Sequence, residues 1–339
     1  YGRGYFSRLP YEKQSESHKK KYPLYIQEII IHDMRVKPDK MHWVQVKDRL
    51  DFNGKEVIKE NINLNGEKVT IRLVLTNVLL DLLFECYDVK DYELGKSISF
   101  KGHKDLFKNY IDFWAEVKKS STGSRRATAK LRLNGLYGKF GSSASSELMH
   151  LTSEDGIFKV DHTDVYTIRE SIYMPMASFI TSYARLKTIS AAQTITDNYN
   201  AGKSKIQFVY ADTDSLHCVS DDYSLPLGLD IDETKLGAWD HEANFKRAKF
   251  LRQKCYIEDH IITQEDYEKG IKGDDAFLYS MDEDGYYKLK ITVAGMPSGC
   301  YNQVTFRNFK LDTSYKGKKQ PKIVEGGVIL REVDFTIKR

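Results

Sequence analysis

Apolar and polar residues alternate with a period of two in the first third of the chain. Between residues 22 and 72 the alternation runs around Asn-Gly pairs at 53–54 and 65–66, which are typical of tight turns between strands. The strongly apolar run 73–87 predicts a helix that begins near Thr76. This part of the chain therefore predicts strands followed by a helix.

The remaining pattern predicts three more helices and a strand-rich C-terminal part. Two helices are expected at about 104–119 and 124–138, joined by a polar Ser-Ser-Thr-Gly link into an antiparallel pair. The segment 142–172 is turn-rich and acidic, and 176–199 returns to helical periodicity. From about 258 short β runs alternate with polar turns, so the fold class is α+β.

Two carboxylates lie at the tip of a predicted hairpin. The strands 206–210 and 215–219 enclose the sequence Ala-Asp-Thr-Asp, which includes Asp212 and Asp214. Because successive strand residues alternate sides, the two aspartates are expected to project together. Two hard anionic oxygen ligands suit Mg²⁺, whereas an ordinary acidic turn is the alternative, since Asp and Thr favour turns.

The helix predicted after the polar link has one unusual face. Two cations, an amide and an aromatic ring fall on it at helical spacing: Arg126, Lys130, Asn134 and Tyr137. The cations would hold phosphates, and the small Gly135 and Gly138 would let a base pair approach the backbone. This face fits a nucleoside triphosphate, although a charge run is also typical of a solvated surface.

These segments carry a resemblance to family B DNA polymerases. Lys-x3-Asn-x2-Tyr-Gly-Lys-Phe at 130–140 resembles motif B, and Tyr-x-Asp-Thr-Asp-Ser at 210–215 resembles motif C. Thr181-x-x-Ala-Arg185 resembles the primer-template motif, and Lys254-Cys-Tyr256 resembles the Lys-x-Tyr motif. The order and spacing of all four match the protein-primed branch, used by phages with linear genomes and terminal proteins.

The resemblance implies a right-hand polymerase architecture with a palm sheet, two-helix fingers, a β-rich thumb and two insertions. The insertions are similar to terminal protein region 1, which contacts the priming protein and the template duplex, and to terminal protein region 2, which is linked to strand displacement. The implied divisions are the end of motif A and the palm start at 1–10, the first insertion at 11–105, the fingers with motif B at 106–141, the second insertion at 142–172, the palm with motif C and Lys-x-Tyr at 173–257, and the thumb at 258–339.

The same resemblance implies roles for single residues. Asp214 would be the direct metal ligand, with Asp212 as the weaker member, in a catalytic site for two Mg²⁺ ions, for which Mn²⁺ is the alternative. The implied nucleotide-binding residues are Tyr1, Lys118, Arg126, Lys130, Asn134 and Tyr137, and the implied DNA-binding residues are Thr181, Arg185, Lys254 and Tyr256. Each has a structural alternative: Arg185 as a palm salt bridge, Tyr256 as a strand-packing ring, and Lys254 as a solvated edge charge.

The N-terminus departs from the family pattern. Tyr1-Gly2 resembles the end of motif A, so the motif A aspartate would lie five residues before Tyr1, and Gly2 stands where proline is usual. Asp-x-Glu pairs at 91–93 and 266–268 have exonuclease-like spacing but lie downstream of the place for that domain, so they are expected to be surface acids. We expect the chain to act with an N-terminal polymerase and exonuclease segment or subunit.

The amino-acid composition excludes fewer classes of function than the motifs do. The formal net charge is only +4, so nucleic-acid contacts must come from local basic clusters, such as 118–132 and 246–254. The 4 cysteines show no paired spacing, and there is no apolar run of the ~18 residues that a membrane span needs. A protein of the cytoplasm, in the host cell if it is viral, is therefore expected.

Two functions remain open from the sequence. The first is template-directed, protein-primed DNA synthesis with strand displacement, using dNTPs, primer-template DNA and a terminal protein as partners. The second is a nucleic-acid-binding or assembly module that keeps the polymerase scaffold without catalysis. The visible carboxylates alone do not separate them, because a two-metal site also needs the carboxylate of motif A.

Overall fold

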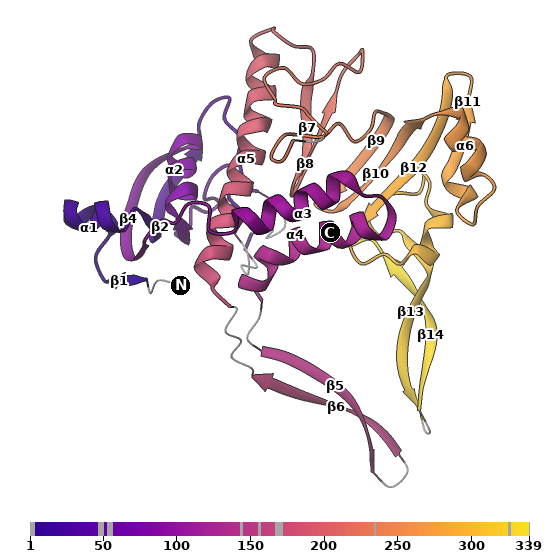
Figure 1. Ribbon diagram of the computed structural model, residues 1–339, viewed down its shortest axis with the longest axis horizontal. Helices are drawn as coiled ribbons and strands as arrows, with labels where there is room; N and C mark the ends of the chain where they lie inside the picture. The colour runs from indigo at the N-terminus through magenta and orange to yellow at the C-terminus, as the bar shows by residue number, and fades with distance from the viewer. Residues whose placement is uncertain are drawn as a thin grey trace. The chain divides into compact units, whose positions relative to one another are not determined.

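The computed structural model describes residues 4–46, 51–52, 57–142, 145–154, 157–166, 172–233, 235–324 and 327–338. It divides into two compact units (Figure 1). The first unit comprises Tyr1–Ala144 and Ile168–Asp240, and the second comprises Ser145–Thr167 and His241–Arg339. Helices and strands occur in both units, which confirms the α+β fold class.

The first unit begins with a four-stranded antiparallel sheet. Its strands follow the order β1 (Tyr5–Ser7), β4 (Tyr87–Phe100), β2 (Leu24–Val36) and β3 (Ile71–Thr76). The short helices η1 (Tyr11–Lys13) and α1 (Glu16–Lys21) lie between β1 and β2. The prediction of a β-rich segment is confirmed at its two ends, in β2 and β3.

The prediction for the middle of that segment was wrong. Between Val36 and Ile71, the described residues form only isolated bridges, such as Ile62 with Lys68, which flanks a turn at Gly66 with φ +82°. The other Asn-Gly pair, at 53–54, lies outside the described residues. The apolar–polar alternation did not predict strands correctly here, because these residues pack on the sheet individually and few of them pair with a neighbouring strand.

Helix α2 (Asn77–Cys86) begins where the sequence predicts. The side-chain oxygen of Thr76 caps it by accepting a hydrogen bond from the Leu79 amide. Residues 73–76 of the apolar run belong instead to β3, whose backbone pairs with β2. Val78, Leu79 and Leu83 are among the buried residues of α2, which packs onto the sheet.

The core of this sheet and helix contains a buried tyrosine hub. The hydroxyl of Tyr87 accepts hydrogen bonds from the Trp43 amide at 2.8 Å and the Val44 amide at 3.0 Å, and donates to the Ile58 carbonyl at 2.9 Å. Burial raises the pKa of Tyr87 to about 12. The hub therefore fixes the segment around Trp43 beneath the sheet.

Truncating Leu83, which is fully buried beside this hub, is expected to destabilise the chain by about 2–5 kcal/mol, because it leaves a cavity in a packed core. Urea denaturation of the Leu83→Ala variant measures this loss. Leu64→Ala is the matched control, because Leu64 is 71% exposed and its change should stay within about 0.5 kcal/mol. Equal losses in the two variants would contradict this assignment of the core.

Helices α3 (Lys108–Ser120) and α4 (Gly123–Phe140) confirm the predicted antiparallel pair. Tyr110 donates from its hydroxyl to the Arg132 carbonyl at 3.2 Å, and Arg126 donates to the Lys118 carbonyl at the same distance. The two links pair the start of one helix with the later part of the other. The guanidinium of Arg132 also lies 5.8 Å from the centre of the Trp114 ring.

Helix α5 (Met174–Asn200) confirms the helix predicted at 176–199. It packs against several elements of the first unit, namely α2, α4, β3 and both strands of the next hairpin. That hairpin is β7 (Gln207–Asp212) and β8 (Ser215–Val219), as the sequence predicts. Figure 1 shows α5 as the longest helix, running beside the two-stranded β7–β8 sheet.

The second unit is strand-rich, as predicted from about residue 258. Its main sheet follows the order β11 (Tyr279–Asp282), β12 (Gly285–Val293), β10 (Cys255–Ile262) and β9 (Phe245–Arg252). Helix α6 (Gln264–Gly270) packs on β11 and β12. The remaining elements are η2 (Ala276–Leu278), η3 (Ser298–Gln303) and the hairpin β13 (Ser314–Val324) with β14 (Gly327–Thr336).

A long hairpin replaces the turn-rich segment expected at 142–172. Strands β5 (Ser145–Glu154) and β6 (Ile157–Tyr166) pair along their whole length, from Ser145 with Tyr166 to Glu154 with Ile157. The expectation of turns was wrong because Ser, Thr and Asp favour turns only while their backbone groups lack other partners. A continuous antiparallel ladder supplies those partners here.

Candidate functional site

The predicted acidic hairpin is present, and its tip is a two-residue turn. Asp212 is the last residue of β7 and pairs with Ser215, which leaves Thr213 and Asp214 in the turn. The Asp214 amide donates to the Asp212 carbonyl at 2.7 Å. Strand alternation therefore does not relate the two aspartates, because Asp214 lies outside the strand; the tight turn sets their relation. Asp212 is half-buried and Asp214 is exposed.

The turn contains a strained residue. Thr213 has φ +58°, which is rare for a β-branched side chain and costs on the order of 1–3 kcal/mol. Several hydrogen bonds hold this conformation. The Thr213 hydroxyl donates to Asp212 Oδ1 at 3.2 Å, Ser215 donates to the Asp212 carbonyl at 3.2 Å, and Thr188 of α5 donates to the Thr213 carbonyl at 3.1 Å.

A buried histidine lies behind the turn. His217 is 8% exposed, its Nε2 lies 3.1 Å from the Ser215 hydroxyl, and its ring centre lies 5.4 Å from that of Tyr210. The Ser215 hydroxyl can donate to the Asp212 carbonyl while it accepts a hydrogen bond from His217, if Nε2 carries the proton. Side chains from β7 and β8 thus support the turn from within the hairpin.

The donor set of the turn fits part of a magnesium site. Mg²⁺ is bound by one or two carboxylates and keeps its other positions for water and substrate phosphates. Asp212 and Asp214 supply two carboxylates, and in the part of the chain that the structure describes no group of three or more His, Cys, Asp or Glu side chains could hold a metal. Among the described residues, this turn therefore offers two candidate protein ligands for a metal.

The predicted nucleotide-binding face lies along α4. Arg126, Lys130 and Asn134 are exposed, and Tyr137 is 45% exposed. The backbone of Lys118 in α3 lies beside this face, because its carbonyl accepts the hydrogen bond from the Arg126 guanidinium. Tyr1, the remaining predicted nucleotide contact, lies outside the described residues.

Two glycines on α4 have no packing reason within the described chain. Apart from the adjoining backbone of α4 itself, a side-chain Cβ built at Gly135 or Gly138 would meet no described atom within 4 Å. A glycine inside a helix costs about 1 kcal/mol relative to alanine. Neither glycine is needed to make room for another described part of this chain, so the open backbone is a feature that a bound molecule could use.

The predicted DNA-binding residues of α5 are exposed on one helical face. Thr181 is exposed, and its hydroxyl returns to the Ala177 and Ser178 carbonyls, each at 3.0 Å. The guanidinium of Arg185 lies 6.0 Å from the centre of the Trp43 ring, within cation–π range. Arg185 lies three residues before Thr188, which holds the acidic turn, so the two share a side of the helix.

In the second unit, Lys254 and Tyr256 have different surroundings. Lys254 is exposed in the turn between β9 and β10, with φ +53°, and its carbonyl accepts a hydrogen bond from the Ala294 amide at 2.9 Å. Tyr256 is only 5% exposed, and its ring centre lies 5.5 Å from that of Phe250. Packing thus accounts for most of the Tyr256 ring, and only a small part of it could reach a DNA strand.

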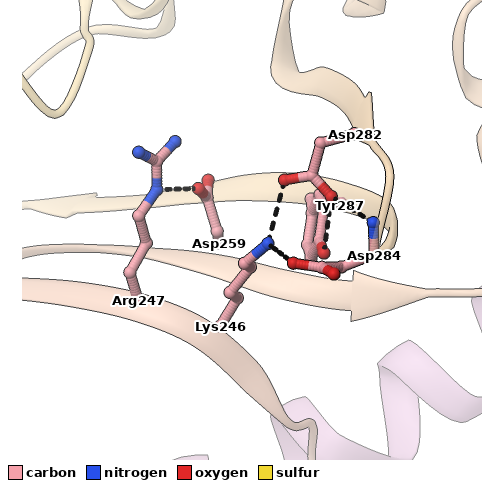
Figure 2. A network of polar contacts seen from close by, with 6 residues as sticks. All are labelled: Lys246, Arg247, Asp259, Asp282, Asp284 and Tyr287. Atoms are coloured by element: carbon pink, nitrogen blue, oxygen red, sulfur yellow. Dashed lines mark hydrogen bonds and ion pairs between the residues drawn. The ribbon is translucent and has the colours of Figure 1, made fainter.

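The basic cluster expected at 246–254 is largely paired within the second unit. The Lys246 ammonium forms ion pairs with Asp282 at 3.0 Å and with Asp284 at 2.5 Å, and both contacts are drawn in Figure 2. These carboxylates, Asp284 first, raise the pKa of Lys246 above its usual value. Arg247 pairs with the buried Asp259 at 2.5 Å. Because these two cations have internal partners, this segment offers DNA less positive charge than its composition indicates.

Sequence reasoning gave no role to three residues that shape the acidic turn. Thr188, Ser215 and His217 contact the turn or its flanks, but hydroxyls and a strand histidine give no distinctive pattern by themselves. One signal for Thr188 was available, because it lies seven residues after Thr181, two helical turns along the same face. The Asp-x-Glu pairs at 91–93 and 266–268 have exposed acids, as predicted.

Comparison with known proteins identifies the family to which this chain belongs. Residues 4–224 match the family described as DNA polymerase type B, organellar and viral. The chain belongs to this family of DNA polymerases. Among the described residues, no helix has the length and apolar character needed to cross a membrane.

Its relatives include DNA polymerases of bacteriophages. The chain is 35% identical over 341 residues to the DNA polymerase of Bacillus phage Nf, covering 100% of this chain and 54% of the relative. It is 36% identical over 322 residues to that of Bacillus phage phi29, covering 94% of this chain and 51% of the relative. The chain therefore spans about half the length of the curated relatives that it matches.

A solved structure has the same fold. The phi29 DNA polymerase complexed with primer-template DNA and incoming nucleotide substrates matches with a TM-score of 0.80 and 34% identity, over 100% of this chain and 54% of that one. Its binary complex with primer-template DNA matches with a TM-score of 0.77. The right-hand polymerase architecture expected from the sequence is thereby confirmed.

Proposed function

We propose that this chain is the polymerising part of a template-directed DNA polymerase, which transfers nucleotides from dNTPs to a primer hydroxyl. The observation that carries the proposal is the acidic turn of β7–β8, which presents Asp212 and Asp214 in a chain of the type B polymerase family. The matching phi29 complex, which contains primer-template DNA and incoming nucleotides, supports these substrates.

In this proposal, Asp214 holds the metal directly and Asp212 is the weaker member of the pair. Two Mg²⁺ ions bound there, or Mn²⁺ in their place, would offset negative charge on the attacking and leaving oxygens of the phosphoryl group. The protein's own part is to fix the carboxylates before substrate arrives. The hydrogen bonds to Thr213 and to the Asp212 carbonyl support that part.

The proposed nucleotide site is the exposed face of α4 with the end of α3. Lys118, Arg126 and Lys130 would hold the triphosphate, because cations make strong charge-assisted hydrogen bonds to phosphate oxygens. Asn134 and Tyr137 would contact the nascent base pair, next to the open backbone at Gly135 and Gly138. Tyr1 would lie under the sugar and exclude a 2′-hydroxyl.

The proposed DNA contacts lie in both units. Thr181 and Arg185 would bind the primer-template backbone, and Lys254 with the edge of Tyr256 would hold the primer terminus. The exposure of Thr181, Arg185 and Lys254 supports these roles.

We also propose protein-primed synthesis with strand displacement in the host cytoplasm. The phage relatives support this mode. In it, the insertion at 11–105 contacts a terminal protein and the template duplex, and the insertion at 142–172 takes part in strand displacement. The fingers at 106–141, the palm at 1–10 and 173–257, and the thumb at 258–339 complete the proposed division.

A second candidate function is a nucleic-acid-binding or assembly module without catalysis. One observation favours it: the described residues gather no more than two candidate metal ligands at the turn, whereas a two-metal site needs a carboxylate from another strand. The matched phage polymerases are about twice as long, so the remaining ligand can be supplied by an upstream segment.

We therefore expect the purified chain to extend a primed template very slowly or not at all, and extension to return when an upstream segment carrying Asp-x-x-Ser-Leu is joined or added. We call the chain combined with this upstream segment the assembled enzyme. The measurement is Mg²⁺-dependent extension of a labelled primer by the chain, the segment and their combination. Replacing the aspartate of the added segment by Asn is the matched control and should keep extension off.

Two outcomes would count against this proposal in different ways. Robust extension by the chain alone would show that it needs no further carboxylate. Failure of extension in a combination that binds primer-template DNA would favour the module without catalysis.

A further inference from the structure

Helix α5 makes a direct contact with the acidic turn. The hydroxyl of Thr188, a residue that is 7% exposed, donates to the carbonyl oxygen of Thr213 at 3.1 Å. Thr213 lies between the two aspartates, 25 residues away in sequence from Thr188. The contact joins two elements of the first unit that pack against each other.

The other described threonines in the body of α5 bond only within their own helix. The hydroxyls of Thr181, Thr194 and Thr196 donate to carbonyls three or four residues earlier. Thr188 has such an acceptor too, the Ala184 carbonyl at 3.2 Å. Because a hydroxyl has one hydrogen, the Thr188 hydroxyl shares its hydrogen bond between the Ala184 carbonyl of its own helix and the Thr213 carbonyl of the turn.

The carbonyl that Thr188 holds belongs to the strained residue of the turn. A β-branched residue at φ +58° persists only where its surroundings fix it more firmly than its own preference. The Asp214 amide bonds to Asp212 across this residue, so the rotation of the Thr213 peptide sets where the Asp214 side chain begins. Ser215 holds the Asp212 carbonyl on the hairpin side, and Thr188 holds the next carbonyl on the helix side.

We propose that Thr188 is a positioning residue for the metal-binding carboxylates, acting through the Thr213 carbonyl to hold Asp214 in its ligating position. This inference rests on the proposed function of the turn. Thr188 itself touches neither carboxylate in the bonds described, so its effect passes through the backbone. Arg185 and Thr188 share a side of α5, so the helix that holds the turn also presents a proposed DNA contact.

The test compares Thr188→Val with Thr188→Ser in the assembled enzyme. Valine keeps the branched shape and removes the donor, whereas serine keeps the donor. Thr196→Val is the matched control, because Thr196 lies on the same helix and bonds only to the Ala192 carbonyl at 2.9 Å.

Three readouts are needed: the affinity for Mn²⁺ alone, without DNA or nucleotide; hydrogen exchange of the Asp214 amide; and kcat with the nucleotide KM. Thr188→Val should weaken Mn²⁺ binding by about 3- to 10-fold, the factor expected for one lost hydrogen bond. Exchange of the Asp214 amide should speed up, and kcat should fall while KM stays within about twofold. Thr188→Ser should restore all three, and Thr196→Val should leave them unchanged.

Wild-type Mn²⁺ affinity and Asp214 exchange in Thr188→Val would overturn the inference. A loss that serine does not restore, and that accompanies a lower Tm, would also overturn it, because the role of Thr188 would then be general packing. Asp214→Asn separates this inference from the proposed function. If Asp214→Asn stays active, the proposed function fails; if it is inactive while Thr188→Val is normal, only the role of Thr188 is lost.

Discussion

Replacing Asp214 by Asn is expected to abolish nucleotide incorporation by the assembled enzyme and to leave primer-template binding within about twofold of wild type. An amide has nearly the shape of the carboxylate but cannot balance the charge of a divalent cation. Asp214 is exposed at the tip of the β7–β8 turn, and its amide group is bound to Asp212. The substitution therefore removes a charge without removing the turn's backbone bond.

The measurements are single-turnover incorporation and a DNA-binding titration in the same buffer. Asp221→Asn is the matched control, because Asp221 is an exposed acid in the loop just after β8. It should retain normal incorporation. Near-normal turnover by Asp214→Asn would show that the acidic turn is structural, as turns rich in Asp and Thr often are.

The second large effect should separate nucleotide contacts from DNA contacts. Lys130→Ala should lower kcat/KM for the nucleotide by about one to three powers of ten, because it removes a charge-assisted phosphate contact. Lys254→Ala should instead weaken duplex binding and reduce the salt dependence by about one unit of slope per lost phosphate contact. Both lysines are exposed, so neither effect should come from the core.

Nucleotide titration and salt-dependent DNA binding of both variants test this crossed pattern. Lys139→Ala is the control on α4, because it lies nine residues after Lys130 and thus on the opposite side of the helix. It should change neither quantity strongly. If Lys130→Ala and Lys254→Ala lost DNA affinity equally and kept a normal nucleotide KM, α3 and α4 would form a plain nucleic-acid-binding surface.

The sequence predicted the elements whose signals are local. The Thr76 cap, the antiparallel helices α3 and α4, the long helix α5 and the β7–β8 hairpin all follow from residues close together in the chain. Three of the four polymerase motifs lie on these elements or at their ends, and the fourth, Lys-x-Tyr, lies where β9 meets β10. This is why the candidate site could be located before its geometry was known.

The features that the sequence did not predict depend on partners distant in the chain. Strand β4 forms because its backbone pairs with β2, more than 50 residues earlier, although its own sequence is rich in charged residues. The Lys246 ammonium binds Asp282 and Asp284, which lie 36 and 38 residues later in the chain, and it is therefore less available to bind DNA. Tyr256 is buried by its strand neighbours, including Phe250.

The alternation of apolar and polar residues could also not predict the backbone geometry of the acidic turn. Alternation describes extended backbone, whereas Thr213 leaves the extended region with φ +58°. That departure is stable only with the hydrogen bonds from α5 and from within the hairpin, and no local propensity encodes them. The residue types could therefore be predicted, but not the way in which they are held.

Helix α5 packs against α4 and against both strands of the β7–β8 hairpin. The spacing between the proposed nucleotide helix and the acidic turn is thus set by this packing, whatever the length of the chain that joins α4 to α5. Changes in the length of that connection, residues 141–173, should therefore leave this spacing unchanged, although they alter the segment proposed for strand displacement. A foreign domain grafted there is expected to leave nucleotide incorporation intact and to change strand displacement.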